Sequence, residues 1–213
     1  MTTDTPAKRA VEDRETAPRL DNQDPSIFGQ TPSQTVGPFF GYALPYEGGP
    51  DLVAPSHPAA IRFRGTITDG AGEPVPDAVV EIWQRDAEGS IPRAQGSLLR
   101  DGIAFTGFGR TATTRAGEYA FTTVRPGAPE GTAPFIVVTV FARGVTHHLS
   151  TRAYFAGGDA DDPLLRAVDP ARLGTLLVVE EGAATGIPVV RFDIRLQGDG
   201  ETVFLDLTGG LDG

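Results

Sequence analysis

The segment Ile61-Arg-Phe-Arg-Gly-Thr-Ile-Thr68 alternates apolar and polar side chains, which is the two-residue period of a half-buried β-strand. It is followed by Asp69-Gly70-Ala71-Gly72, a composition typical of a turn, and the next strand-like run is Ala78–Gln84. We expect these two runs to pair as antiparallel neighbours. The body of the chain therefore begins as β structure.

Further short runs bounded by Gly or Pro continue this pattern. The predicted strands are Gly109–Thr113, Glu118–Val124, the nearly all-apolar and hence central Phe135–Ala142, and a hairpin of Arg191–Gln197 with Glu201–Asp206. Asp162 before Pro163 is expected to cap a short helix. The spacing predicts an all-β fold, a β-sandwich of two packed sheets with short helical pieces and long loops, whose core holds Trp83 and the phenylalanines.

Length and charge narrow the organisation and the partners. The 213 residues suit one domain, and the net charge of −10 disfavours nucleic acid and anionic membranes as partners. The chain has no Cys, which excludes thiolate chemistry, and it shows no signal peptide, so we expect a cytoplasmic protein. Residues 1–26 are charged and poor in large apolar residues and are predicted to be a disordered tail. Residues 27–213 are predicted to form the single domain, beginning with an extended arm over 27–60.

Few residues suggest chemistry by themselves. Adjacent His147 and His148 would point to opposite faces of a strand, so they are expected to be turn histidines, with a shared metal as the less favoured alternative. A cluster of acidic residues is expected to serve turn solvation and helix capping, with a weak Ca²⁺ site as the alternative; its members are Asp159, Asp161 and Asp162. The four tyrosines are expected to be structural, with a phenolate metal ligand as the less favoured alternative; they are Tyr42, Tyr46, Tyr119 and Tyr154. The residues alone indicate no catalytic apparatus.

Several segments together carry a family resemblance that runs from Thr31 to Asp206. They are Thr31-Pro-Ser-Gln-Thr-Val-Gly-Pro38, Val80-Glu-Ile-Trp-Gln84, Phe108-Gly-Arg-Thr-Ala-Thr-Thr114, Phe141-Ala-Arg-Gly144, Arg191-Phe-Asp-Ile-Arg-Leu-Gln-Gly198 and Gly200-Glu-Thr-Val-Phe204. With these motifs the chain resembles the intradiol ring-cleavage dioxygenase family, and within it the α-type subunits that act on protocatechuate beside a β subunit.

The resemblance implies a function shared between two chains. A homologous β subunit would be the partner, αβ pairs would assemble further, and Fe³⁺ would be bound by the β subunit alone. The complex would cleave 3,4-dihydroxybenzoate with O₂ between its hydroxyls to 3-carboxy-cis,cis-muconate, in aromatic catabolism by the β-ketoadipate pathway. This chain alone would be inactive. Where catalytic members carry two Tyr and two His as iron ligands, this sequence has Ile91, Pro129, Phe135 and Val137.

The resemblance also implies which residues of this chain approach the substrate. Thr35, Gly37, Pro38 and Phe39 would line the pocket of the β subunit, and Arg143 would stand near its entrance to attract the substrate carboxylate. No catalytic residue and no metal ligand is expected in this chain. The alternative for Arg143 is a solvent-exposed turn arginine with no contact to the substrate. The alternatives for the whole chain are a stand-alone β-sandwich that serves binding or structure, and an independent dioxygenase.

Overall fold

The structure, a computed structural model, describes residues 34–37, 39–94, 104–128, 131–156 and 162–206. All of these residues lie within the unit Gln34–Gly213. The predicted tail over residues 1–26 lies outside the described residues, and its boundary with the domain stays a prediction.

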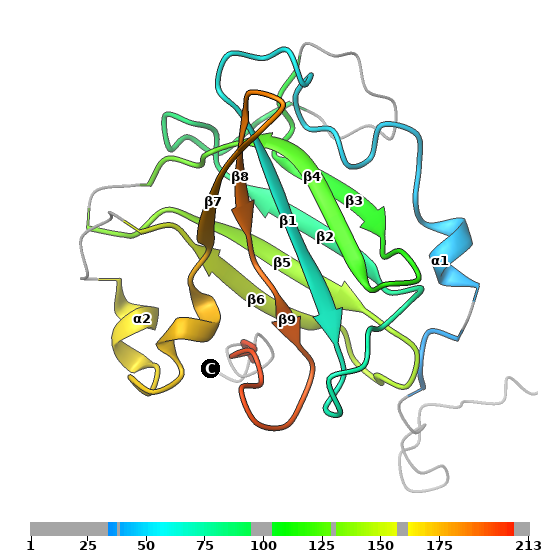
Figure 1. The fold of residues 1–213 in the computed structure, drawn as a ribbon. Coiled ribbons are helices and arrows are strands. Elements are labelled where there is room, and N and C mark those ends of the chain that lie inside the picture. The colour runs from blue at the N-terminus through cyan, green and yellow to red at the C-terminus, as the bar shows by residue number, and fades with distance from the viewer. Residues whose placement is uncertain (1–33, 38, 95–103, 129–130, 157–161, 207–213) are drawn as a thin grey trace, which may run out of the picture. The chain divides into compact units, whose positions relative to one another are not determined.

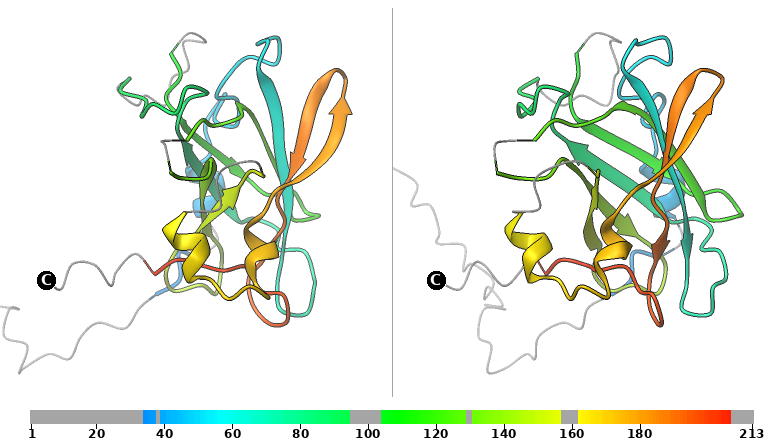
Figure 2. Two further views of the ribbon diagram at one scale, coloured as in Figure 1. Left: turned by 90° about the vertical axis from the view of Figure 1, so that its left-hand side faces the viewer. Right: turned by 60° about the vertical axis from the view of Figure 1, so that its left-hand side comes forward.

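Two antiparallel-rich sheets face each other in this unit (Figure 1). The five-stranded sheet has the order β4-β1-β8-β7, with β9 also paired to β1; its strands are β1 (Ala60–Thr68), β4 (Glu118–Val124), β7 (Val179–Ala184), β8 (Ile187–Arg191) and β9 (Ile194–Arg195). The four-stranded sheet has the order β3-β2-β5-β6; its strands are β2 (Val79–Gln84), β3 (Phe108–Ala112), β5 (Phe135–Phe141) and β6 (Leu149–Tyr154). Seen from the side, the sheets form two layers (Figure 2). The predicted β-sandwich is confirmed.

Helical structure is sparse in the described residues. It consists of α1 (Phe40–Ala43), α2 (Pro163–Ala167) and the 3-10 helix η1 (Leu173–Leu176). As predicted, the Asp162 carboxylate caps α2, since it accepts hydrogen bonds from the N–H groups of Leu164 and Leu165. Each of these helices is far shorter than a membrane crossing requires.

The core fills the space between the inner faces of the two sheets. On β1 the alternation places Phe63 and Ile67 inside, and on β5 it places Ile136 and Val138 inside, each with no exposed surface. Aromatic rings of β1, of β4 and of the segment between β8 and β9 pack together, since Phe63 lies 6.0 Å from Tyr119 and stacks on Phe192 at a centroid distance of 6.3 Å. The period-two pattern thus determines which side chains make the core.

One predicted pairing is wrong, because β1 and β2 lie in different sheets. The chain turns back at Asp69–Glu73, and the N–H of Val75 reaches the carbonyl of Ile67, but it then crosses to the other layer. Both edges of β1 are already occupied, by β4 on one side and by β8 and β9 on the other. Alternation therefore identifies β1 and β2 as strands but does not identify their neighbours.

Trp83 does not lie in the core. It follows the inward-pointing Ile82, so the strand period turns it to the outer face of the four-stranded sheet, where it is half-buried opposite Val137 and Phe108. The predicted C-terminal hairpin is also wrong in extent. It is limited to the Arg195–Thr202 pair, after which the Leu205 N–H donates to the Ser150 carbonyl in the other sheet.

A close backbone approach fixes the break between β8 and β9. A Cβ placed on Gly65 would lie 1.8 Å from the carbonyl oxygen of Phe192, so only glycine fits there. The Tyr119 hydroxyl donates to the same carbonyl, and the Asp193 carboxylate accepts from the N–H of Thr66 at 3.0 Å. These contacts hold the irregular residues against β1.

Candidate functional site at the N-terminal arm

The described part of the arm ahead of β1 exposes aromatic side chains at α1, a single turn of helix that begins after Phe39. Phe40 of α1 is buried, while Phe39 is 79% and Tyr42 85% exposed. Residues three apart on a helix share a face, so these two rings stand together in solvent. Val36 is also exposed, at 47%. Large apolar side chains gathered on one element indicate an interaction surface.

The arm is fastened to the turn that follows β5. The N–H of Gly144 donates to the hydroxyl oxygen of Thr35 at 2.9 Å, a contact between residues far apart in the sequence. In the same turn, an Nη atom of Arg143 lies 3.0 Å from a carboxylate oxygen of Asp77, just before β2. Three separate chain segments therefore meet at this point.

A second fastening holds the end of α1 against the outer face of the four-stranded sheet. Arg110 of β3 donates to the carbonyl of Leu44 at 3.0 Å and pairs with Glu81 of β2 at 2.6 Å. Its guanidinium also lies 6.0 Å from the ring centre of Tyr46, within cation–π range. The exposed rings of Phe39 and Tyr42 thus lie between two attachment points of the arm, at Thr35 and at Leu44.

The structure brings together some of the residues predicted to line the pocket. Thr35 and Arg143 belong to the same contact region, and the Phe39 side chain projects into solvent from the arm between the two fastenings. Gly37 has a φ of +74° with nothing near its Cβ position, so its conformation rather than space requires glycine. Pro38 lies outside the described residues.

Asp77 is the residue of this region that the sequence did not reveal. It follows Pro76, where the sequence indicates only a turn, and nothing in the sequence links it to Arg143. The pair is half-exposed, with side-chain exposures of 55% for Arg143 and 30% for Asp77. An ion pair this exposed stabilises a fold by less than about 1 kcal/mol, so its contribution lies in placing the guanidinium.

The positions predicted to have lost iron ligands carry only carbon at their side-chain ends. Ile91 is 51% exposed, and Val137 is half-buried on the outer face of β5. Phe135 packs on Tyr154 at 5.4 Å, with the guanidinium carbon of Arg152 4.2 Å above its ring. Pro129 lies outside the described residues. Fe³⁺ requires oxygen and imidazole donors, so the described positions do not fit this ion.

Other metal candidates are not assembled in the described part of the chain, where no group of three or more His, Cys, Asp or Glu side chains is placed to hold a metal ion. His148 packs against the Phe141 ring at 5.6 Å, and His57 accepts a hydrogen bond from the N–H of Ala59. Asp162 is occupied in capping α2, while Asp159 and Asp161 lie outside the described residues. Neither alternative metal site gains support here.

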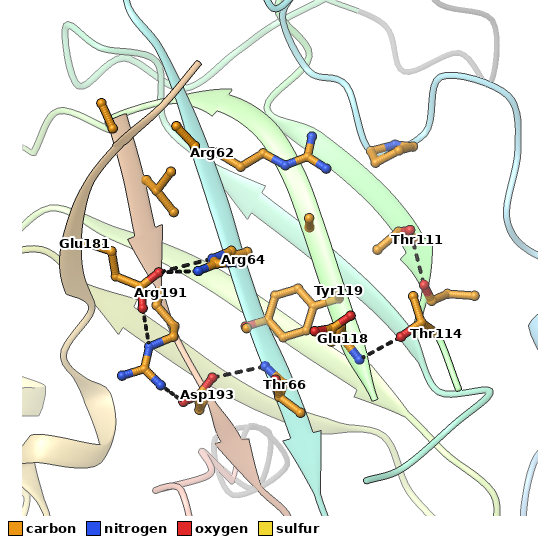
Figure 3. A pocket seen from close by; sticks show the side chains of 17 residues that line it. Arg62, Arg64, Thr66, Thr111, Thr114, Glu118, Tyr119, Glu181, Arg191 and Asp193 are labelled. Atoms are coloured by element: carbon orange, nitrogen blue, oxygen red, sulfur yellow. Dashed lines mark hydrogen bonds and ion pairs between the residues drawn. The ribbon is translucent and has the colours of Figure 1, made fainter. Parts of the chain in front are cut away.

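A hollow of about 880 Å³ lies on the outer face of the five-stranded sheet (Figure 3). Its charged side chains are three arginines and three carboxylates: Arg62, Arg64, Arg191, Glu118, Glu181 and Asp193. Glu181 accepts from Arg64 at 2.7 Å and pairs with Arg191 at 2.8 Å. The hydrogen bond from Arg64 is the main cause that lowers the pKa of Glu181. Because its charges balance and largely pair with one another, the hollow has no excess charge with which to attract an ion.

The comparison with protein families identifies the class to which this fold belongs. The family model described as "Dioxygenase" matches residues 53–198, which cover both sheets of the sandwich. The chain belongs to the intradiol dioxygenase family.

Particular relatives narrow this assignment to one kind of subunit. The chain is 42% identical over 195 residues to the protocatechuate 3,4-dioxygenase alpha chain of Burkholderia cepacia, with 84% of this chain and 98% of the relative covered. Identity to the alpha chain of Pseudomonas putida is 40% over 200 residues, with the same coverage. The beta chain of Burkholderia cepacia matches at 31% over 206 residues, covering 84% of this chain and 80% of the relative. The resemblance expected from the motifs is confirmed, and it favours the α-subunit assignment over a stand-alone module.

Solved structures agree on the fold. The dioxygenase domain of a dioxygenase and carbohydrate-binding protein fusion from Streptomyces sp. SirexAA-E aligns with a TM-score of 0.51 and 25% identity, over 79% of this chain and 98% of that one. An intradiol ring-cleavage dioxygenase from Tetranychus urticae aligns with a TM-score of 0.53 over 68% of this chain and 84% of that one, at 15% identity. The second likeness supports the architecture alone.

Proposed function

We propose that this chain is the iron-free α subunit of an enzyme that cleaves protocatechuate with O₂ to 3-carboxy-cis,cis-muconate. The single observation that carries the proposal is the attachment of the arm, which joins Thr35 to the Arg143 turn while Phe39, four residues further along the chain, stays exposed. Such an arrangement offers a cation and a shaped apolar edge, but no group that could carry out the reaction. The 42% sequence identity between this chain and an alpha chain supports the same role.

The partner is a homologous β subunit, and that subunit holds the Fe³⁺ of the complex. Two observations support this division. The described positions Ile91, Phe135 and Val137 offer no donor to a ferric ion, and beta chains are found among the relatives. The α chain therefore contributes shape and charge to a pocket that it does not build alone. The cytoplasm as its location stays a prediction.

In this complex the arm closes one side of the substrate pocket. Phe39 and Tyr42 are buried against the β subunit, since their exposure in the isolated chain leaves a large apolar surface in water. Arg143 faces the entrance and attracts the carboxylate of protocatechuate, with which a guanidinium forms charge-assisted hydrogen bonds. Thr35 and Gly37 set the course of the arm around this cation.

The test is purification of the α chain with and without a co-expressed β chain, with iron content and O₂ uptake on protocatechuate measured for both. We expect iron and O₂ uptake in the co-purified complex and neither in the α chain alone. Stoichiometric iron in the isolated α chain would contradict the division of roles. A soluble α monomer that does not bind the β chain would favour the stand-alone module.

A further inference from the structure

Asp77 occupies an unusual backbone conformation from which its carboxylate reaches Arg143. Its φ is +58°, in the left-handed region that few residues other than Gly, Asn and Asp adopt. The residue is nevertheless Asp, and its carboxylate oxygen lies 3.0 Å from an Nη atom of Arg143. The backbone at this position would suit glycine better, yet the residue is Asp77, whose carboxylate pairs with Arg143.

The backbone around Asp77 is held firmly, so its carboxylate has a fixed origin. The next residue, Ala78, is fully buried, and its N–H donates to the hydroxyl oxygen of Thr113 at 2.9 Å. The Thr113 N–H in turn donates to the carbonyl of Ala78 at 2.8 Å. On the other side Gly41 of α1 lies so close that a Cβ there would come within 3.2 Å of the Asp77 carbonyl oxygen. Asp77 is therefore placed by β2, by the end of β3 and by the arm together.

Arg143 has its backbone held in a turn, where the N–H of Val145 donates to the carbonyl of the buried Ala142 at 3.3 Å, but its side chain extends into solvent. It lies in the turn after β5 next to Gly144, and its side chain is 55% exposed. Within the described residues, Asp77 forms its one ion pair, and that pair engages a single nitrogen of a guanidinium that has five N–H donors. No other partner contacts this guanidinium among the residues that the structure describes, so its remaining donors can receive a second carboxylate.

We propose that Asp77 is a positioning residue, which holds the Arg143 guanidinium beside the arm so that its remaining donors receive the carboxylate of the ring-cleavage substrate. This inference rests on the proposed function, because it takes Arg143 as the group that attracts the substrate. Asp77 acts through Arg143 and touches no substrate atom. It thereby strengthens the preference for catechols that carry a carboxylate over those that do not.

The test uses the co-purified αβ complex with Asp77→Gly and Asp77→Asn, two variants that suit the left-handed backbone. Their KM and kcat are measured on protocatechuate and on catechol, which lacks the carboxylate. Asp77→Gly is expected to raise KM for protocatechuate by about two- to fivefold, as expected for an exposed ion pair, without changing kcat or either constant for catechol. Asp77→Asn keeps an acceptor oxygen but loses the charge, so its effect is expected to be smaller.

The double variant Asp77→Gly with Arg143→Ala separates positioning from general damage. If Asp77 acts through Arg143, adding Asp77→Gly to Arg143→Ala changes KM no further. Glu201→Ala is the matched control, since it removes another exposed partner of an arginine, Arg172, at 3.7 Å, and it should leave the preference unchanged.

The inference is overturned if Asp77→Gly leaves the preference for protocatechuate unchanged, or if it raises KM equally in the presence and absence of Arg143. A wild-type complex that fails to cleave protocatechuate would instead contradict the proposed function. The two failures are therefore distinguished by the wild-type measurement.

Discussion

The hydroxyl oxygen of Thr35 accepts a hydrogen bond from the N–H of Gly144 at 2.9 Å, and this contact joins the N-terminal arm to the turn that carries Arg143. The two residues are separated by 109 positions in the sequence. The contact puts the arm and the one cation predicted to meet the substrate into a common frame. A disturbance of the arm should therefore be felt at Arg143.

Thr35→Val removes the acceptor while keeping the shape of the side chain, so the Gly144 amide should exchange with solvent faster. An exposed hydrogen bond of this kind contributes about 1 kcal/mol, which corresponds to roughly a fivefold change in local protection. Hydrogen–deuterium exchange of the α chain measures it. Thr35→Ser keeps the hydroxyl and should retain the protection. Equal exchange in all three proteins would show that the contact does not hold the arm.

Arg143→Ala is expected to raise KM for protocatechuate by about tenfold in the αβ complex, with kcat changed little, because a charge-assisted hydrogen bond to the carboxylate is lost and solvent exposure limits its worth. Steady-state O₂ uptake gives both constants. Arg143→Lys keeps the charge but not the planar fork of donors, so its KM should lie between those of the wild type and of Arg143→Ala. An unchanged KM in Arg143→Ala would remove Arg143 from the pocket.

Replacing the exposed rings, Phe39→Ala together with Tyr42→Ala, should weaken binding of the β chain without destabilising the α chain, because both side chains are largely in water in the isolated chain. Co-purification and analytical ultracentrifugation report the binding, and thermal unfolding reports the stability. Phe40→Ala is the contrasting variant. It removes a ring that is only 9% exposed and should cost about 3 kcal/mol of unfolding free energy. Undiminished binding by the double variant would exclude this surface from the αβ interface.

Gly65→Ala is expected to lower the free energy of unfolding by about 3 kcal/mol, since the new methyl group would collide with the Phe192 carbonyl oxygen and push β8 and β9 off β1. Chemical denaturation measures the loss. Gly174→Ala is a suitable control, because nothing lies within 4 Å of its Cβ position. Equal stabilities of the two variants would refute the close approach at Gly65.

The Tyr119 hydroxyl predicts how stability changes at alkaline pH. Burial raises its pKa well above the ordinary value of 10.0. The folded state therefore retains a proton that the unfolded chain loses, so the stabilisation is complete below pH 10 and declines as the pH rises above it. Tyr119→Phe should be about 1 kcal/mol less stable at pH 7 and should lose less stability between pH 10 and 11. Urea unfolding at each pH measures the stability of both proteins. An identical decline of the unfolding free energy at alkaline pH in the two would contradict this account.

Part of the candidate site was accessible from the sequence through the family resemblance, because the motifs that carry this resemblance are local. The Thr35-Val-Gly37 run and the Phe141-Ala-Arg-Gly144 run each identify their residues without reference to the rest of the chain. Their meeting, and the presence of Asp77 between them, were not accessible. A hydrogen bond across 109 positions depends on how the sheets pack, and no periodicity in either segment encodes it.

The sequence by itself determined where β1 to β5 form and which faces of β1 and β5 are buried, because a period of two in side-chain polarity is a property of each segment alone. It did not reveal β7, whose side chains are exposed throughout, nor β8 beyond Arg191. Phe63, Ile67, Ile136 and Val138 are buried for that reason. Only the tertiary structure decided which strands are neighbours and that Asp77 pairs with Arg143. Strand pairing depends on the competition among all edges for hydrogen-bond partners, and that competition is resolved only when the whole sandwich has packed.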